Sequence, residues 1–164
     1  MGEEYSIRTI NPIDSEIELI ASRMRQTLIE VLGEEKGKEM YSMPEVIERV
    51  RWHLDPEKVC AHVFVAEDDA GKNVGHTIVR VDDDGEGNPI GLFATTYIIP
   101  EVRRKGLAVR LIEEGERWMK GQDMAYAATY TDEDNEKLQQ LYLQQGYVIS
   151  PMPKGFVKLS KSLF

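Results

Sequence analysis

A short basic segment, Arg103-Arg104-Lys105-Gly106, separates a β-branched apolar run from a strongly amphipathic one. This order predicts a strand, a turn and then a helix that begins near Gly106. The start of a helix leaves backbone N–H groups unpaired and carries a partial positive charge, so it attracts anions. Glycine lets the backbone come close to a phosphate, and the neighbouring cations add to the attraction. The segment therefore predicts a phosphate-binding turn.

The residues on either side of this turn support that interpretation. Residues 90–99 are rich in β-branched and aromatic side chains and are followed by Pro100, as expected for a largely buried strand. After Gly106 the apolar residues recur at helical spacing, which predicts a helix with one face on a sheet. The apolar face carries Leu107, Ala108, Leu111, Ile112, Trp118 and Met119. The other face, expected to be solvated, carries Arg110, Glu113, Glu114, Glu116 and Arg117.

A second segment, residues 135–147, predicts a helix followed by a strand. One face of this helix carries Leu138, Leu141, Tyr142 and Gln145. Its N-cap oxygen is expected from Thr131, Asp132 or Asp134. Gly146 suits the left-handed conformation that often ends a helix. On spacing alone, Tyr142 is an ordinary core tyrosine.

Both segments match the motifs of one known family. Arg103-x-x-Gly106-x-Ala108 resembles the (Gln/Arg)-x-x-Gly-x-(Gly/Ala) signature with which the GNAT superfamily of N-acetyltransferases holds the pyrophosphate of acetyl-CoA. Residues 135–147 are similar to that family's Asn-x-x-Ala-x-x-Leu-Tyr-x-x-x-Gly-Phe pattern, with Leu138 in place of alanine and Tyr147 in place of phenylalanine. The two segments stand in the family's order, and the resemblance covers nearly the whole chain.

The resemblance implies a function for particular residues. It implies that acetyl-CoA is the acetyl donor and that Tyr142 is the acid that protonates the departing thiolate. It also implies that the main chain at 97–99 binds pantetheine and polarises the thioester carbonyl. The residues expected to bind the cofactor are Tyr97, Ile98, Ile99, Arg103, Arg104, Lys105, Gly106, Leu107, Ala108 and Asn135. No metal is expected, and residues 11–60 are expected to wall the acceptor pocket.

The general base is left open by the sequence. The candidates are Glu67, His76 and the aspartates at 82–84, with a chain of water molecules as the alternative. Histidine has the most suitable ordinary pKa, but a lone histidine in a strand is more often structural. Glu67 is expected to be a solvated turn residue.

The composition indicates a small enzyme and excludes several other classes. A chain of 164 residues is expected to form one domain, residues 1–164. The net charge of −9 argues against a nucleic-acid partner and favours a cationic substrate. No apolar run approaches the roughly 18 residues that span a bilayer. The single cysteine, Cys60, is expected to be a small core residue. It cannot form an internal disulfide, which is compatible with a reducing compartment, so a cytoplasmic location is expected.

The rest of the chain predicts an α/β fold with a mixed, mostly antiparallel sheet flanked by helices. Helices are expected from Asp14 or Ser15 to near Gly33 and from Pro44 to before Pro56, with a polar segment between them. Further strands are expected at 5–10, 61–66, 74–81, 124–130, 147–149 and 155–159. The acidic stretch 82–88 predicts a solvated hairpin loop, because an EF-hand begun at Asp82 needs glutamate where Phe93 stands.

These observations lead to one main hypothesis and two alternatives. The main hypothesis is acetyl-CoA-dependent N-acetyl transfer to a primary amine of a small molecule or a peptide. The first alternative is a non-catalytic acyl-CoA-binding or protein-interaction module on the same fold. The second, general nucleotide-phosphate binding, lacks the Walker lysine spacing and a Rossmann glycine triplet. The sequence does not identify the acceptor amine, and a homodimer is a common state in the resembled family.

Overall fold

The computed structural model describes residues 4–35 and 41–164, so part of the polar segment expected before Tyr41 lies outside the described residues. The helices are α1 (Asp14–Leu32), α3 (Met43–His53), α4 (Leu107–Gly121) and α5 (Glu136–Gln144), with short 3-10 turns at η1 (Pro100–Val102) and η2 (Pro153–Gly155). The strands are β1 (Ser6–Thr9), β2 (Ala61–Glu67), β3 (Asn73–Asp83), β4 (Pro89–Ile98), β5 (Tyr126–Asp132), β6 (Val148–Pro151) and β7 (Phe156–Ser162). The predicted helices and strands are confirmed, with shifts of a few residues at their ends.

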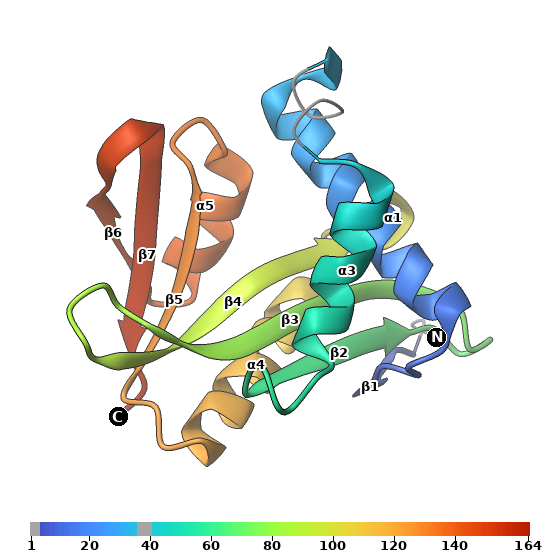
Figure 1. Cartoon of the computed structure of the whole chain (residues 1–164), viewed down its shortest axis with the longest axis horizontal. Helices are drawn as coiled ribbons and strands as arrows, with labels where there is room; N and C mark the ends of the chain where they lie inside the picture. The colour runs from blue at the N-terminus through green and yellow to red at the C-terminus, as the bar shows by residue number, and fades with distance from the viewer. Residues whose placement is uncertain (1–3, 36–40) are drawn as a thin grey trace.

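The strands form one seven-stranded sheet in the order β1-β2-β3-β4-β5-β7-β6. Every neighbouring pair is antiparallel except β4 and β5, which run parallel. Only Gly91 with Ala127 and Leu92 with Ala128 pair across β4 and β5. Beyond these pairs the two strands diverge, and Figure 1 shows them leaving the shared point in different directions. The predicted mixed, mostly antiparallel α/β fold is confirmed.

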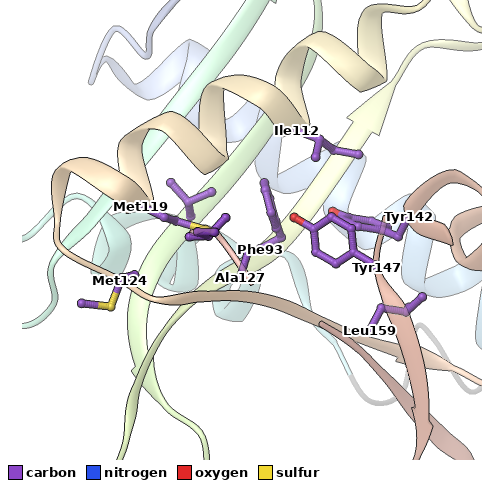
Figure 2. Close-up of a cluster of buried hydrophobic side chains, with 10 residues drawn as sticks. Phe93, Ile112, Met119, Met124, Ala127, Tyr142, Tyr147 and Leu159 are labelled. Carbon is purple, nitrogen blue, oxygen red and sulfur yellow. The ribbon is translucent and has the colours of Figure 1, made fainter. Parts of the chain in front are cut away.

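Helices cover both faces of the sheet. In Figure 1, α1 and α3 lie in front of β2, β3 and β4, and α4 lies behind them. The front core joins Ile17 and Ile20 of α1 to Val46 and Val50 of α3 and to Val65 of β2. A second core joins α4 and α5 to β3, β4, β5 and β7, and Figure 2 shows part of it. The helical and strand periodicities seen in the sequence thus serve to bury apolar surface between these layers.

Two local predictions need correction. The N-cap of α5 is Asn135, whose Oδ1 accepts a hydrogen bond from the N–H of Leu138 at 3.3 Å, and not one of the three residues expected, Thr131, Asp132 or Asp134. Asp132 is the last residue of β5, and its carboxylate instead accepts from the N–H of Asp134 at 2.8 Å. The left-handed stop at Gly146 is confirmed, with φ of +90°.

Cys60 is exposed and is not the core residue that the sequence predicts. Cys60 lies one residue before β2 and beside the C-terminal end of α4, so the helix does not cover its side chain. The thiol faces Gln122, with the sulfur 3.4 Å from Oε1. Across the described residues, no helix is both long and apolar enough to cross a membrane.

The close packing of α4 on the sheet depends on Gly115. A Cβ at this position would meet the ring of Phe93 and, at 3.1 Å, the side chain of Val79. Phe93 is fixed by its neighbours in the core, so neither contact can relax cheaply. Gly115 therefore sets the spacing between α4 and β4.

We predict that Gly115→Ala lowers the free energy of unfolding by about 1–3 kcal/mol, since overpacking outweighs the better helix propensity of alanine. Gly121→Ala is the matched control, because it lies in the same helix and its added Cβ meets nothing within 4 Å. Urea unfolding followed by circular dichroism measures both. Equal stability of the two variants would contradict the assigned role of Gly115.

Candidate functional site

The basic turn lies between the end of β4 and the start of α4. The chain leaves β4 at Ile98, passes through η1 and reverses at Arg104 and Gly106, both with positive φ (66° and 77°). Gly106 is the N-cap of α4 and provides no side-chain cap, and the first helical turn contains no acidic residue. The N–H groups at this helix start are therefore left to an anion, as a phosphate-binding turn requires.

The side chain of Arg103, the first residue of the turn, bonds to the end of β4. Arg103 donates a hydrogen bond from Nε to the carbonyl oxygen of Ile98 at 2.8 Å, and its guanidinium lies 5.6 Å from the centre of the Tyr97 ring. The side chains of Arg103, Arg104 and Lys105 are all exposed. The turn thus presents cationic groups beside a helix start.

The divergence of β4 and β5 interrupts the pairing of the sheet. We call the unpaired stretch between these two strands the opening. The extra residue Ala94 forms a bulge, because Ile78 pairs with Thr95 whereas Val79 pairs with Phe93. The last direct link between the strands is the Thr129 hydroxyl, which donates to the Phe93 carbonyl at 3.0 Å. Past this link the main chain of β4 faces the opening instead of a neighbouring strand.

The backbone of Ile98 faces this opening. Ile99 donates its N–H to the carbonyl of Val74 on β3. Neighbouring residues of a strand direct their backbone groups to opposite sides, so those of Ile98 point away from β3. Of the three residues predicted to bind pantetheine through the main chain, Ile98 thus faces the opening, whereas the backbone groups of Tyr97 and Ile99 point to β3.

Tyr142 lies beneath the opening. It comes from α5 and is 1% exposed, with ring centres 5.7 Å from Phe93 and 5.0 Å from Tyr147 (Figure 2). Burial raises the pKa of the phenol well above its usual value, while the hydroxyls of Thr96 on β4 and Thr129 on β5 act to lower that pKa. The net effect keeps the phenol protonated at neutral pH, which is the state that a proton donor needs.

Asn135 is held within the protein. Its oxygen caps α5, and its amide donates to the Thr131 hydroxyl at 3.2 Å. These bonds fix the start of the helix that carries Tyr142 two turns later. Both polar atoms of the Asn135 side chain are thus used at the start of α5, and its contact with the cofactor stays a prediction.

Three of the candidate bases, His76, Glu67 and Asp82, are buried or ion-paired. His76 is fully buried, both its ring nitrogens lack a partner among the described residues, and burial together with Arg23 lowers its pKa to about 3. Glu67 is the last residue of β2 and forms an ion pair with Arg8 at 2.7 Å. The prediction that it is a solvated turn residue is therefore wrong. Asp82 is paired with Arg80 at 2.9 Å near the other end of β4.

Thr96, Thr129 and Glu116 take part in the site although the sequence gives no sign of it. The two threonines interact with Tyr142 because β4 and β5 lie side by side just before they diverge. Glu116 accepts hydrogen bonds from Tyr147 at 2.6 Å and from Lys161 at 3.1 Å, so this residue of the charged face of α4 is largely covered. These partners lie far apart in the sequence, which explains why no local pattern reveals them.

A pocket of about 410 Å³ lies elsewhere, between the end of α3, the start of β2 and the end of α4. Cys60, His62 and Trp118 line it. This region is at the far end of α4 from the basic turn. Within the described part of the chain, no group of His, Cys, Asp or Glu side chains is arranged to hold a metal ion.

Comparisons with known proteins agree with this geometry. No curated protein matches the chain by sequence. Among solved structures, the chain is similar to PaiA N-acetyltransferase from Thermoplasma acidophilum in complex with coenzyme A, with 15% identity, a TM-score of 0.76 and 97% of this chain and 99% of that chain covered.

Two further structures share the fold. The aminoglycoside N-acetyltransferase AAC(6')-Iy in complex with CoA is 18% identical, with a TM-score of 0.72 and 93% of each chain covered. A chain of the NatC complex bound to Gag peptide and CoA is 17% identical, with a TM-score of 0.71 and coverage of 98% of this chain and 99% of that chain.

The model of the acetyltransferase (GNAT) family matches residues 21–147. This range contains the basic turn, the opening between β4 and β5, and α5 with Tyr142. The match covers most of the sequence, and the chain therefore belongs to the GNAT acetyltransferase family.

Proposed function

We propose that this protein transfers the acetyl group of acetyl-CoA directly to a primary amine, and that residues 1–164 form a single acetyltransferase domain. The observation that carries the proposal is the opening between β4 and β5, with the basic turn at its edge and the protonated Tyr142 phenol beneath it. A single continuous sheet, from β1 to β6, supports the domain assignment.

The residues of the site fit an acyl-CoA. The uncapped start of α4 suits a pyrophosphate, held by the backbone at 103–108 and by Arg103 and Arg104. The N–H group of Ile98 faces the opening and suits a carbonyl oxygen of pantetheine, while the Ile98 carbonyl is already bonded to Arg103. When bound, acetyl-CoA supplies an activated acetyl group and a thiol leaving group, whose ordinary pKa is near 8.5.

Tyr142 has the role of acid in this proposal. A phenol that stays protonated at neutral pH can donate a proton to the departing sulfur. Asn135 positions the phenol by fixing the start of α5. Because His76 is buried and Glu67 and Asp82 are ion-paired, the proposal gives deprotonation of the amine to water.

The acceptor is a primary amine of a small molecule or a peptide. The chain shares its fold with an aminoglycoside acetyltransferase and with a chain of a complex bound to a peptide, so both kinds of acceptor belong in the test panel. The net charge of −9 favours cationic acceptors within it.

The alternative function is a non-catalytic acyl-CoA-binding module, and the lack of a positioned base is the observation that favours it. Both functions require cofactor binding, so only turnover separates them. Release of free thiol from acetyl-CoA, measured with a panel of amines, supports the enzyme. Tight cofactor binding without acetylated product in any amine supports the module.

We predict that Arg104→Ala weakens acetyl-CoA binding about tenfold, which corresponds to one lost charge-assisted hydrogen bond to phosphate. Lys120→Ala, which removes an exposed cation from the other end of α4, is the matched control and should leave the dissociation constant unchanged. Isothermal titration calorimetry with acetyl-CoA, CoA and ATP measures these affinities. Equal weakening by both substitutions would show a general charge effect and no phosphate site at the turn.

We predict that Tyr142→Phe lowers kcat about 10²-fold, with acetyl-CoA affinity and thermal stability close to those of the parent, because only the proton donor is lost. Tyr147→Phe is the control, since this neighbouring buried tyrosine donates to Glu116 and has no assigned part in proton transfer. Steady-state kinetics at several pH values compares the two. An unchanged kcat in Tyr142→Phe would remove this residue from the mechanism.

A further inference from the structure

The side chain of Tyr97 connects the phosphate turn to α1, on the opposite face of the sheet from α4. The register places Val65, His76 and Tyr97 in one row across β2, β3 and β4. Val65 packs against Ile17 and Ile20 of α1, so this row faces α1. The side chain of Tyr97 shares this row, and it also packs against the apolar cluster at the end of β4 and the start of α4.

Three groups surround the Tyr97 ring. The Arg23 guanidinium from α1 lies 5.7 Å from the ring centre, and that of Arg103 lies 5.6 Å from it. The imidazole of His76 stacks on the ring at 6.1 Å with an angle of 22° between the planes. Cations at these distances are attracted to an aromatic ring. Tyr97 is thus the shared contact of the acceptor-side helix α1 and the first residue of the turn.

Arg23 is held in place by β3 and by this ring. It donates to Oδ1 of Asn73 at 2.6 Å and to the Asn73 carbonyl at 2.8 Å. Its side chain is half-buried, and this burial lowers its pKa. Among the described residues no carboxylate forms an ion pair with it, so the aromatic ring is a substantial part of its environment.

Arg103 is restricted by the same ring. Its Nε donates to the Ile98 carbonyl, and the ring packs against the guanidinium. Within the described part of the chain, nothing accepts a hydrogen bond from its two terminal NH2 groups. An arginine held in this way loses less conformational freedom when it binds phosphate, which favours affinity.

We propose that the Tyr97 side chain is a positioning residue that holds Arg103 ready for the pyrophosphate, with Arg23 as the buttress on the other helix. The inference rests on the proposed function and adds to it a role for α1 in cofactor binding. It separates Tyr97 from a residue that only lines the acceptor pocket. In that other role, its substitution would change KM for the amine and leave cofactor affinity unaltered.

The test compares Tyr97→Phe, which keeps the ring, with Tyr97→Leu, which removes it. Calorimetry with CoA should give a dissociation constant close to the parent's for Tyr97→Phe and about fivefold weaker for Tyr97→Leu. In the double variant Tyr97→Leu with Arg103→Ala, the two losses should not add, because they act through the same guanidinium. Arg23→Gln should weaken CoA binding in the parent and have no effect in Tyr97→Leu.

Unchanged CoA affinity in Tyr97→Leu, or full additivity with Arg103→Ala, would overturn the proposal while leaving the proposed function intact. A parent that does not bind CoA would instead overturn the proposed function. Nuclear magnetic resonance of the arginine Nε–H groups tests the positioning without any cofactor. The Arg103 signal should carry a ring-current shift in the parent and in Tyr97→Phe and lose it in Tyr97→Leu, and a parent without this shift would refute the proposal.

Discussion

The short parallel pairing between β4 and β5 is the constraint on which the site depends. Two residue pairs join the strands, and the Thr129 hydroxyl then closes the contact at Phe93. The bulge at Ala94 bends β4 where the pairing ends. Backbone groups that an ordinary sheet would satisfy internally are thereby offered to a ligand. A continued ladder of backbone hydrogen bonds would use those groups within the sheet.

Residues that stabilise the fold lie next to Tyr142 at this opening. Phe93 holds the edge of the opening, contacts the Tyr142 ring and packs where Gly115 lets α4 approach the sheet. Asn135 fixes the start of the helix that carries Tyr142. The position of the phenol is therefore determined by packing against β4 and by the cap of α5. The proposed role of Tyr142 as proton donor requires this kind of rigid support.

Much of the fold could be predicted from the sequence, because hydrophobic periodicity and turn residues are local signals. The strand, turn and helix around Gly106 follow from a change of period within a few residues. The partner of Glu67, by contrast, is Arg8, which lies in another strand far away in the sequence. Cys60 stands at the start of an apolar segment, which predicts burial, but its exposure depends on where α4 ends on the neighbouring face. Thr131, Asp132, Asp134 and Asn135 all carry a side-chain oxygen that could cap α5. The path of the backbone after β5 decides that Asn135 does so.

The environment of Tyr142 bears on how an acid of high pKa can assist a thiol leaving group. Burial raises the pKa of the phenol, which alone would make proton donation harder. A thiolate that forms in the same buried opening is also deprived of water, so its own proton affinity rises as well. The hydroxyls of Thr96 and Thr129 favour the charged form of the phenol and so offset part of this rise in its pKa. The two effects therefore reduce the pKa difference between the proposed donor and its leaving group that burial of the phenol alone would create.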